Sequence, residues 1–140
     1  MSQENVEIVR RVTNVMDAEG FEAALPVFLE AAHSDVEWRE DPAWPGSAAY
    51  RGVEQVRQVI LDRMDTLDFD QQTEDLIPVD DKVVALVRWR GRGKASGAQG
   101  EISMAMVWTL REQAITSVEF YLDRAQALEA VGLRKDSRSS

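Results

Sequence analysis

Cysteine is absent from the 140-residue sequence, and histidine occurs once. Without cysteine the chain forms no disulfide, has no thiolate nucleophile and offers no sulfur ligand to zinc. The single histidine, His33, is adjacent to Ser34, and adjacent residues cannot form a nucleophile–base pair. One histidine without cysteine is also a poor transition-metal site. We therefore expect neither a metal nor a cofactor, and we assign His33 to a loop.

Positive charge is also scarce, because 16 Lys and Arg stand against 25 Asp and Glu, for a formal net charge of -9. Such a surface repels phosphate backbones and anionic lipids. The apolar runs are too short to cross a membrane, and the acidic start Met1–Glu4 has no signal-peptide pattern. We expect a cytoplasmic protein without a nucleic-acid or membrane partner.

The length of the chain fits one domain with a single modest core. We place that domain at residues 1–133. The remaining segment, 134–140, is polar and serine-rich, and it is predicted to be disordered.

Helical spacing of apolar residues predicts the first part of the chain. A first helix, ending at Gly20, carries an apolar stripe: Val6, Val9, Val12 and Met16. Further helices are predicted over 21–32 and from Val53 to Leu67. A short terminal helix is predicted between an N-cap at Asp123 and a stop at Gly132.

Strands account for most of the rest. An alternating segment over 35–41 predicts a first short strand, and 69–79 predicts a polar one. Apolar runs over 82–92 and 101–111, with the segment ending at Tyr121, predict an antiparallel meander. Two-residue turns are predicted at Asp80–Asp81 and Glu112–Gln113.

Pairing Trp89 with Met104 would gather one apolar face, because side chains alternate along a strand. That face would hold Val83, Ala85, Val87, Trp89, Met104, Met106 and Trp108. Such a cluster is either ordinary core or the lining of a pocket for a flat, apolar molecule, with methionine giving adaptable contacts.

The turn at Glu112–Gln113 would then pair Met106 with Glu119 and Met104 with Tyr121, while the preceding turn would set Glu74 opposite Val87. Two carboxylates in an apolar pocket would be candidates for acid–base catalysis. A register shift would make both of them surface charges. Tyr121 is either a hydrogen-bond donor to a ligand or an anchor for the edge of the sheet.

An irregular loop is predicted over 41–47 by two prolines and a glycine. Trp44 lies within it. A large aromatic residue in such a loop packs over the edge of the core or over the mouth of a pocket.

The whole pattern resembles the SnoaL-like polyketide cyclase branch of the nuclear-transport-factor-2-like superfamily. The residues that carry the resemblance are 35–38 (DVEW), 50–52 (YRG), 107–111 (VWTLR), 121–124 (YLDR) and 127–133 (ALEAVGL). The resemblance implies an α+β fold: a cone-shaped half-barrel of a curved, mainly antiparallel mixed sheet. It also implies three N-terminal helices on the concave face, a short C-terminal helix and an apolar pocket.

Steroid-isomerase relatives place a general-base aspartate before a proline, which Asp41–Pro42 resembles. Counting from the start of the strand instead puts Trp38 at that position. The isomerases' tyrosine and protonated aspartate correspond here to Thr13 and Met106. Asp41 is thus either a base or the first residue of an Asp-Pro turn. Trp38 and Met16 are further candidates for lining the pocket.

From this resemblance we expect a small-molecule pocket protein, with acid–base isomerase, cyclase or hydrolase chemistry on an apolar carbonyl or polycyclic substrate. The alternative is a non-catalytic ligand-binding or dimerisation module. We also expect a homodimer through the outer face of the sheet, where apolar and charged residues mix: Val84, Leu86, Arg88, Arg90 and Thr109.

Overall fold

A computed structural model of the chain describes residues 2–44, 46–93, 97 and 99–133. The helices are α1 (Ser2–Glu19), α2 (Phe21–Ala31), α3 (Val53–Thr66) and α4 (Arg124–Ala130). The strands are β1 (Ala32–Arg39), β2 (Ala49–Arg51), β3 (Leu67–Val79), β4 (Lys82–Gly93), β5 (Gln99–Arg111) and β6 (Ala114–Tyr121). The predicted tail, 134–140, lies outside the described residues, as does most of the turn that joins β4 to β5.

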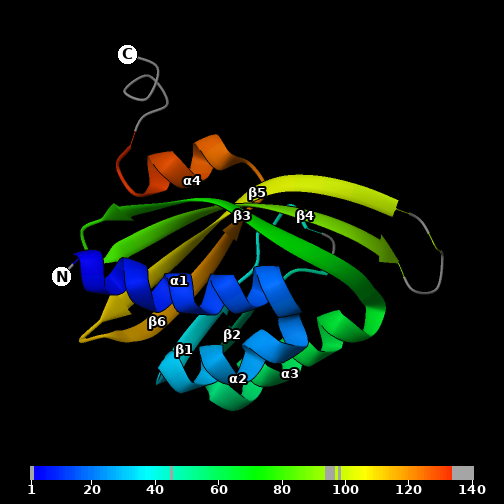
Figure 1. Cartoon of the computed structure of the whole chain (residues 1–140), viewed down its shortest axis with the longest axis horizontal. Coiled ribbons are helices and arrows are strands. Elements are labelled where there is room, and N and C mark those ends of the chain that lie inside the picture. The colour runs from blue at the N-terminus through cyan, green and yellow to red at the C-terminus, as the bar shows by residue number, and fades with distance from the viewer. Residues whose placement is uncertain (1, 45, 94–96, 98, 134–140) are drawn as a thin grey trace.

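The six strands form one sheet in the order β2-β1-β6-β5-β4-β3. All neighbours are antiparallel except β1 and β6, which run parallel. Helices α1 to α3 cover one face of the sheet, and α4 lies on the other (Figure 1). This is the α+β cone that the resemblance implies.

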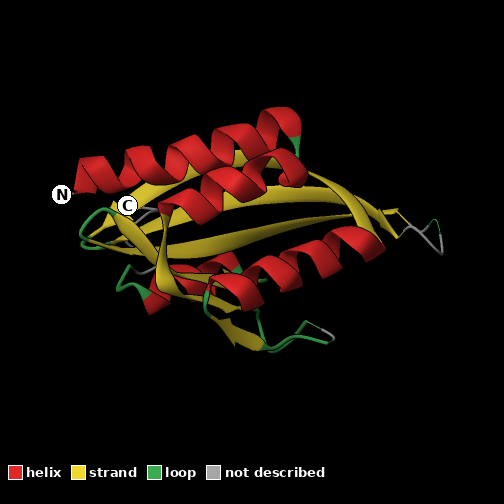
Figure 2. Cartoon of the chain, turned by 90° about the horizontal axis from the view of Figure 1, so that it is seen from below, coloured by secondary structure: helices red, strands yellow, loops and turns green. Residues whose placement is uncertain are grey.

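The inner face of the sheet is apolar, and the helices bury it. Val9 and Val12 of α1 and Phe28 of α2 are 0 to 2% exposed against the sheet. The inner residues of β4 and β5 belong to the same core: Val83, Ala85, Val87, Trp89, Met104, Met106 and Trp108. Strands β4 and β5 continue past the ends of α1 and α2 (Figure 2).

The end signals predicted at Gly20, Asp123 and Gly132 are confirmed, whereas α2 and α3 each end one residue earlier than predicted. Gly20 ends α1 with φ +94°, a left-handed conformation that glycine adopts without strain. Asp123 caps α4 by accepting a hydrogen bond from the backbone N of Ala125 at 2.8 Å. At the other end the N–H of Leu133 donates to Leu128 O at 2.7 Å, across Gly132.

The pairing predicted between β5 and β6 is wrong by one residue. The turn at Glu112–Gln113 forms as expected, but a bulge follows between Thr109 and Leu110. Beyond it Met106 pairs with Phe120, whereas Glu119 pairs with Val107 and Tyr121 with Ala105. Because a shift of one residue reverses the face of every side chain, Glu119 and Tyr121 lie on the outer face.

Two other pairings also differ from prediction. Trp89 pairs with Ile102 and not with Met104, but this shift of two residues leaves the inner face unchanged. In β3 a bulge between Thr73 and Asp75 displaces Glu74 from its predicted position opposite Val87. The carboxylate of Glu74 therefore pairs with Arg88 and Arg124 and not with the apolar core.

Strand β1 begins earlier than predicted, and β2 was not predicted at all. His33 lies at the start of β1 and not in a loop. It is exposed, and its Nδ1 accepts a hydrogen bond from the backbone N of Asp35 at 3.0 Å. Strand β2 is three residues long and pairs with β1 at the edge of the sheet.

Helix α4 covers the apolar part of the outer patch that was predicted to form a dimer interface, whereas Arg90 in the same patch stays exposed. Val84 is fully buried in a second apolar cluster with Ala127 and Leu128 of α4, and Leu86 packs against that cluster. Val84 is therefore buried, and Leu86 partly buried, by their own chain. None of the helices in the described part of the chain has the length and hydropathy needed to span a lipid bilayer.

Candidate functional site

An apolar cleft of about 460 Å³ opens at the wide end of the cone. Its floor is the inner face of β4 and β5, including the backbone of three glycines, Gly91, Gly93 and Gly100. Its walls are mostly apolar side chains: Trp44, Phe69, Trp89, Ile102, Met104 and Leu122. Three polar residues complete the lining, namely Arg92, Gln99 and Glu101.

Trp44 separates this cleft from the interior of the cone. Its ring lies edge-on to Trp89, with centroids 5.8 Å apart, and edge-on to Phe120 at 6.4 Å. The loop that carries it makes two tight turns, in which Trp44 N donates to Asp41 O and Ser47 N donates to Trp44 O. Trp44 therefore packs against the core and also borders the cleft, so the structure places it at both of the positions that the sequence left open.

A small void of about 20 Å³ lies on the other side of Trp44. Trp44, Phe69 and Trp89 line both the void and the cleft. The rest of the void is lined by Phe21, Trp38, Glu40, Ile60, Arg63, Met64 and Phe120. Trp38, predicted to line a pocket, therefore faces this inner void and not the open cleft.

Glu40 is the buried carboxylate of the interior, and sequence reasoning missed it. Its side chain is 2% exposed and forms a bidentate ion pair with Arg63 of α3, Nε donating to Oε2 at 2.8 Å and Nη2 to Oε1. The backbone N of Ala48 donates to Oε1 at 3.3 Å, and the indole N–H of Trp38 to Oε2 at 3.4 Å. The bond to Glu40 raises the pKa of Arg63. The signal was available, since Val36, Trp38 and Glu40 alternate along one face.

Asp41, the candidate base, is 9% exposed and fully engaged by backbone donors. One oxygen accepts from Ala43 N at 2.9 Å, which forms the turn before Trp44, and the other accepts from Leu122 N at 2.7 Å. Asp41 thus joins the loop to the end of β6. Of the two interpretations of this aspartate, these bonds favour the turn.

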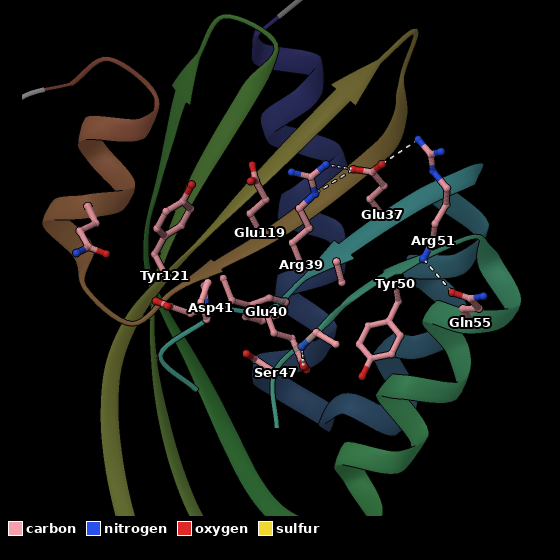
Figure 3. A pocket seen from close by; sticks show the side chains of 15 residues that line it. Glu37, Arg39, Glu40, Asp41, Ser47, Tyr50, Arg51, Gln55, Glu119 and Tyr121 are labelled. Atoms are coloured by element: carbon pink, nitrogen blue, oxygen red, sulfur yellow. Dashed lines mark hydrogen bonds and ion pairs between the residues drawn. The ribbon is translucent and has the colours of Figure 1, made fainter. Parts of the chain in front are cut away.

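A second, polar cleft of about 780 Å³ lies on the outer face, between β6, β1 and β2. Figure 3 shows Tyr121, Glu119, Arg39 and Glu37 in a row on the same side of the sheet. Glu37 bridges Arg39 at 2.8 Å and Arg51 at 2.9 Å. Desolvation, followed by the nearby carboxylates of Glu119 and Asp41, raises the pKa of Tyr121, so its phenol stays protonated at neutral pH.

Glu74 lies away from both clefts. It accepts 2.6 Å hydrogen bonds from Arg124 and Arg88, and its side chain is 29% exposed. The same Arg124 guanidinium donates to the carbonyls of Met104 and Val87 at 3.2 and 2.9 Å. The hydrogen bond from Arg124 lowers the pKa of Glu74. This cluster fixes the start of α4 to the back of the sheet.

The other predicted pocket residues fall into two groups. Trp89 and Met104 line the cleft, and the indole N–H of Trp89 donates to the buried Gln71 at 2.8 Å. Met16, Met106 and Trp108 lie in the core, 7% exposed or less. The ring of Trp108 packs edge-on to that of Phe28, with centroids 5.9 Å apart, as expected for an ordinary core residue.

The three predicted carboxylates therefore do not converge on one cavity. Asp41 and Glu119 border the outer cleft, Glu74 pairs with arginines, and the apolar cleft receives none of them. Among the residues that the structure describes, no group of three His, Cys, Asp or Glu side chains is placed to hold a metal ion.

The comparison with protein families settles the classification, because the model of the SnoaL-like domain matches residues 9–118. The chain belongs to the SnoaL-like domain family. A comparison with curated proteins gives no match for this SnoaL-like domain.

Solved structures of the same fold are similar along nearly the whole chain. An NTF2-like protein from Burkholderia xenovorans LB400 has 21% identity and a TM-score of 0.74, over 94% of this chain and 97% of its own. A protein described as a SnoaL-like polyketide cyclase, from Jannaschia sp. CCS1, has 17% identity and a TM-score of 0.75, over 93% and 92%. TerC, co-crystallised with polyporic acid, has 17% identity and a TM-score of 0.73, over 91% and 98%. At these identities the likeness shows the fold alone.

The hydrogen bonds of Asp41 predict that replacing this residue destabilises the fold. Asp41→Ala leaves the N–H groups of Ala43 and Leu122 without acceptors and should lower the free energy of unfolding by about 1–3 kcal/mol. Asp41→Asn keeps one acceptor oxygen and should cost less. Asp70→Ala, at an exposed position of β3, is the control and should change stability by less than about 0.5 kcal/mol. Urea unfolding would test this, and equal stability of the two alanine variants would contradict it.

The lowered pKa of Glu74 predicts that this residue makes a pH-dependent contribution to the free energy of unfolding. Since its folded pKa is lowered, its charge stabilises the fold above the unfolded value of about 4.3, and this contribution is lost as pH falls through the folded value. Wild type should therefore exceed Glu74→Gln in stability at pH 7, and the difference should close in acid. Glu101→Gln breaks an exposed pair with Arg90 and should show little difference at any pH. Unfolding curves across pH measure both, and a gap at Glu74 that persists unchanged in acid would refute this role.

Proposed function

We propose that this SnoaL-like domain binds a flat, apolar small molecule in the cleft beside Trp44. The observation that carries the proposal is the lining of that cleft, which is aromatic and aliphatic on its walls and glycine backbone on its floor. Its volume of about 460 Å³ lies within the range of small-molecule sites, roughly 300–1,000 Å³. The co-crystallisation of TerC with polyporic acid gives a precedent in the same fold.

The same lining favours binding over acid–base turnover in this cleft. Glu101, the carboxylate among the lining residues, forms an ion pair with Arg90 at 3.2 Å and is 48% exposed. A general base needs a carboxylate within hydrogen-bond reach of the substrate, and Glu101 is committed to a partner at the surface. Orientation of the ligand would therefore come from shape and from aromatic contacts.

Acid–base chemistry is the second candidate, and it would use the outer cleft. What favours it is the arrangement of Glu119 next to a protonated Tyr121, because no hydrogen bond or ion pair engages the Glu119 carboxylate among the described residues. In that case Glu119 would act as the base and Tyr121 as the hydrogen-bond donor. This chemistry requires the outer cleft to be open in solution.

A homodimer through the sheet would instead close the outer cleft. The uncovered part of the outer face carries both signs of charge, Glu37 and Glu119 beside Arg39 and Arg51. A two-fold axis through such a patch would bring each arginine near a partner carboxylate, because the same surface occurs on both copies. We propose this patch as the interface, in place of the one that α4 covers.

The ligand proposal is tested by two apolar positions of equal exposure. Ile102, 38% exposed, lines the cleft, whereas Leu61, 40% exposed, lies on α3 outside it. Ile102→Glu should weaken the binding of N-phenyl-1-naphthylamine about tenfold or more, since a charge replaces apolar contact area. Leu61→Glu should leave the affinity unchanged. Fluorescence titration measures both, and equal affinities would refute the cleft as the site.

The dimer proposal is tested by reversing one charge. Arg39→Glu would set like charges against each other twice across a two-fold axis, so the variant should sediment as a monomer at micromolar concentration while wild type sediments as a dimer. Arg10→Glu, on the exposed face of α1, is the control and should remain dimeric. A wild-type monomer would remove the interface and leave the outer cleft open for the second candidate function.

A further inference from the structure

We propose that Trp44 sets the depth of the pocket and thereby restricts the ligand to one short, flat ring system without a long extension. This inference rests on the proposed function of the apolar cleft. It concerns which molecules the cleft accepts and assigns Trp44 a role in specificity.

The first observation is that the interior of the cone is divided and not solid. The open cleft of about 460 Å³ and the small void of about 20 Å³ share three lining residues, Trp44, Phe69 and Trp89. Phe69 and Trp89 belong to strands, with their rings 4.7 Å apart. Trp44 is therefore the only one of the three shared residues that comes from a loop.

The second observation is that the loop is fastened by residues other than Trp44. At its start Asp41 accepts from Ala43 N and Leu122 N. At its end Glu40 accepts from Ala48 N, and Arg63 donates to Gly46 O at 3.2 Å. These bonds involve no side-chain atom of Trp44, so truncating the indole should leave the loop in place.

The third observation is what lies behind the indole. The lining of the void includes the Glu40–Arg63 ion pair and Trp38, whose indole N–H donates to Glu40. Removing the indole of Trp44 would join the cleft to the void and extend the pocket toward this ion pair. In the wild type a ligand must stop at the indole, and any further atoms stay in water.

A homologous series of 4-n-alkylphenols measures this limit directly. Each methylene that enters an apolar site should raise affinity about threefold to fourfold, and each that stays in water should add nothing. Wild type should therefore show affinity that rises with chain length and then levels off. For Trp44→Ala the affinity should level off at an alkyl group several methylenes longer, because the joined pocket takes up more of that group.

Two further variants make the result specific. Ile102→Ala widens the cleft at its outer wall and should lower the affinity of every phenol without moving the length at which affinity levels off. Trp44→Leu, which opens the partition only in part, should give an intermediate length. It also provides the test if Trp44→Ala does not fold, as judged by near-UV circular dichroism and urea unfolding.

The outcomes separate this inference from the proposed function. If wild type binds neither N-phenyl-1-naphthylamine nor any phenol, the function of the cleft and the inference both fail. If wild type binds and the limiting length is the same in wild type, Trp44→Ala and Trp44→Leu, the cleft remains a site but Trp44 is not its partition. A limit that moves with the size of residue 44, and not with Ile102→Ala, supports the inference.

Discussion

Two adjacent buried carboxylates hold the open end of the cone in shape. Glu40 and Asp41 follow β1, and burying either one without partners would cost several kcal/mol, on the order of the stability of a whole domain. Glu40 accepts hydrogen bonds from Arg63 of α3 and from the backbone at the end of the loop. Asp41 accepts hydrogen bonds from the backbone at the start of the loop and at the end of β6. The sheet, the third helix and the Trp44 loop are thereby tied together at one point.

This arrangement also explains why the apolar cleft contains no catalytic carboxylate. A carboxylate whose oxygens already accept from backbone N–H groups or from a bidentate arginine has little capacity to take a proton from a substrate. Both acids closest to the interior are used in this way. The cleft is left with aromatic and aliphatic walls, and the polar chemistry of the chain gathers on the opposite side of the sheet.

Much of the fold was predictable because its signals are local. Glycines and an N-cap aspartate marked the helix ends, and alternation in β4 and β5 identified the inner face even where the register was wrong by two residues. The site was harder, since a bulge at Thr109–Leu110 adds one residue without a sequence signature and reverses the side of Glu119 and Tyr121. Strand β2 is too short to show a period, and the partner of Glu40 lies 23 residues further along the chain.

The strand order has a consequence for how the chain assembles during synthesis. Strand β6 joins β1 to the β3–β5 meander, yet it follows both of them in the sequence. As the chain leaves the ribosome, β1 and the meander are therefore both synthesised before the strand that connects them. Helix α4, which seals the outer apolar cluster around Val84, emerges later still. The two halves of the sheet would be joined, and the outer apolar cluster covered, only once β6 and α4 have emerged, so the nascent domain depends on these two elements to escape aggregation.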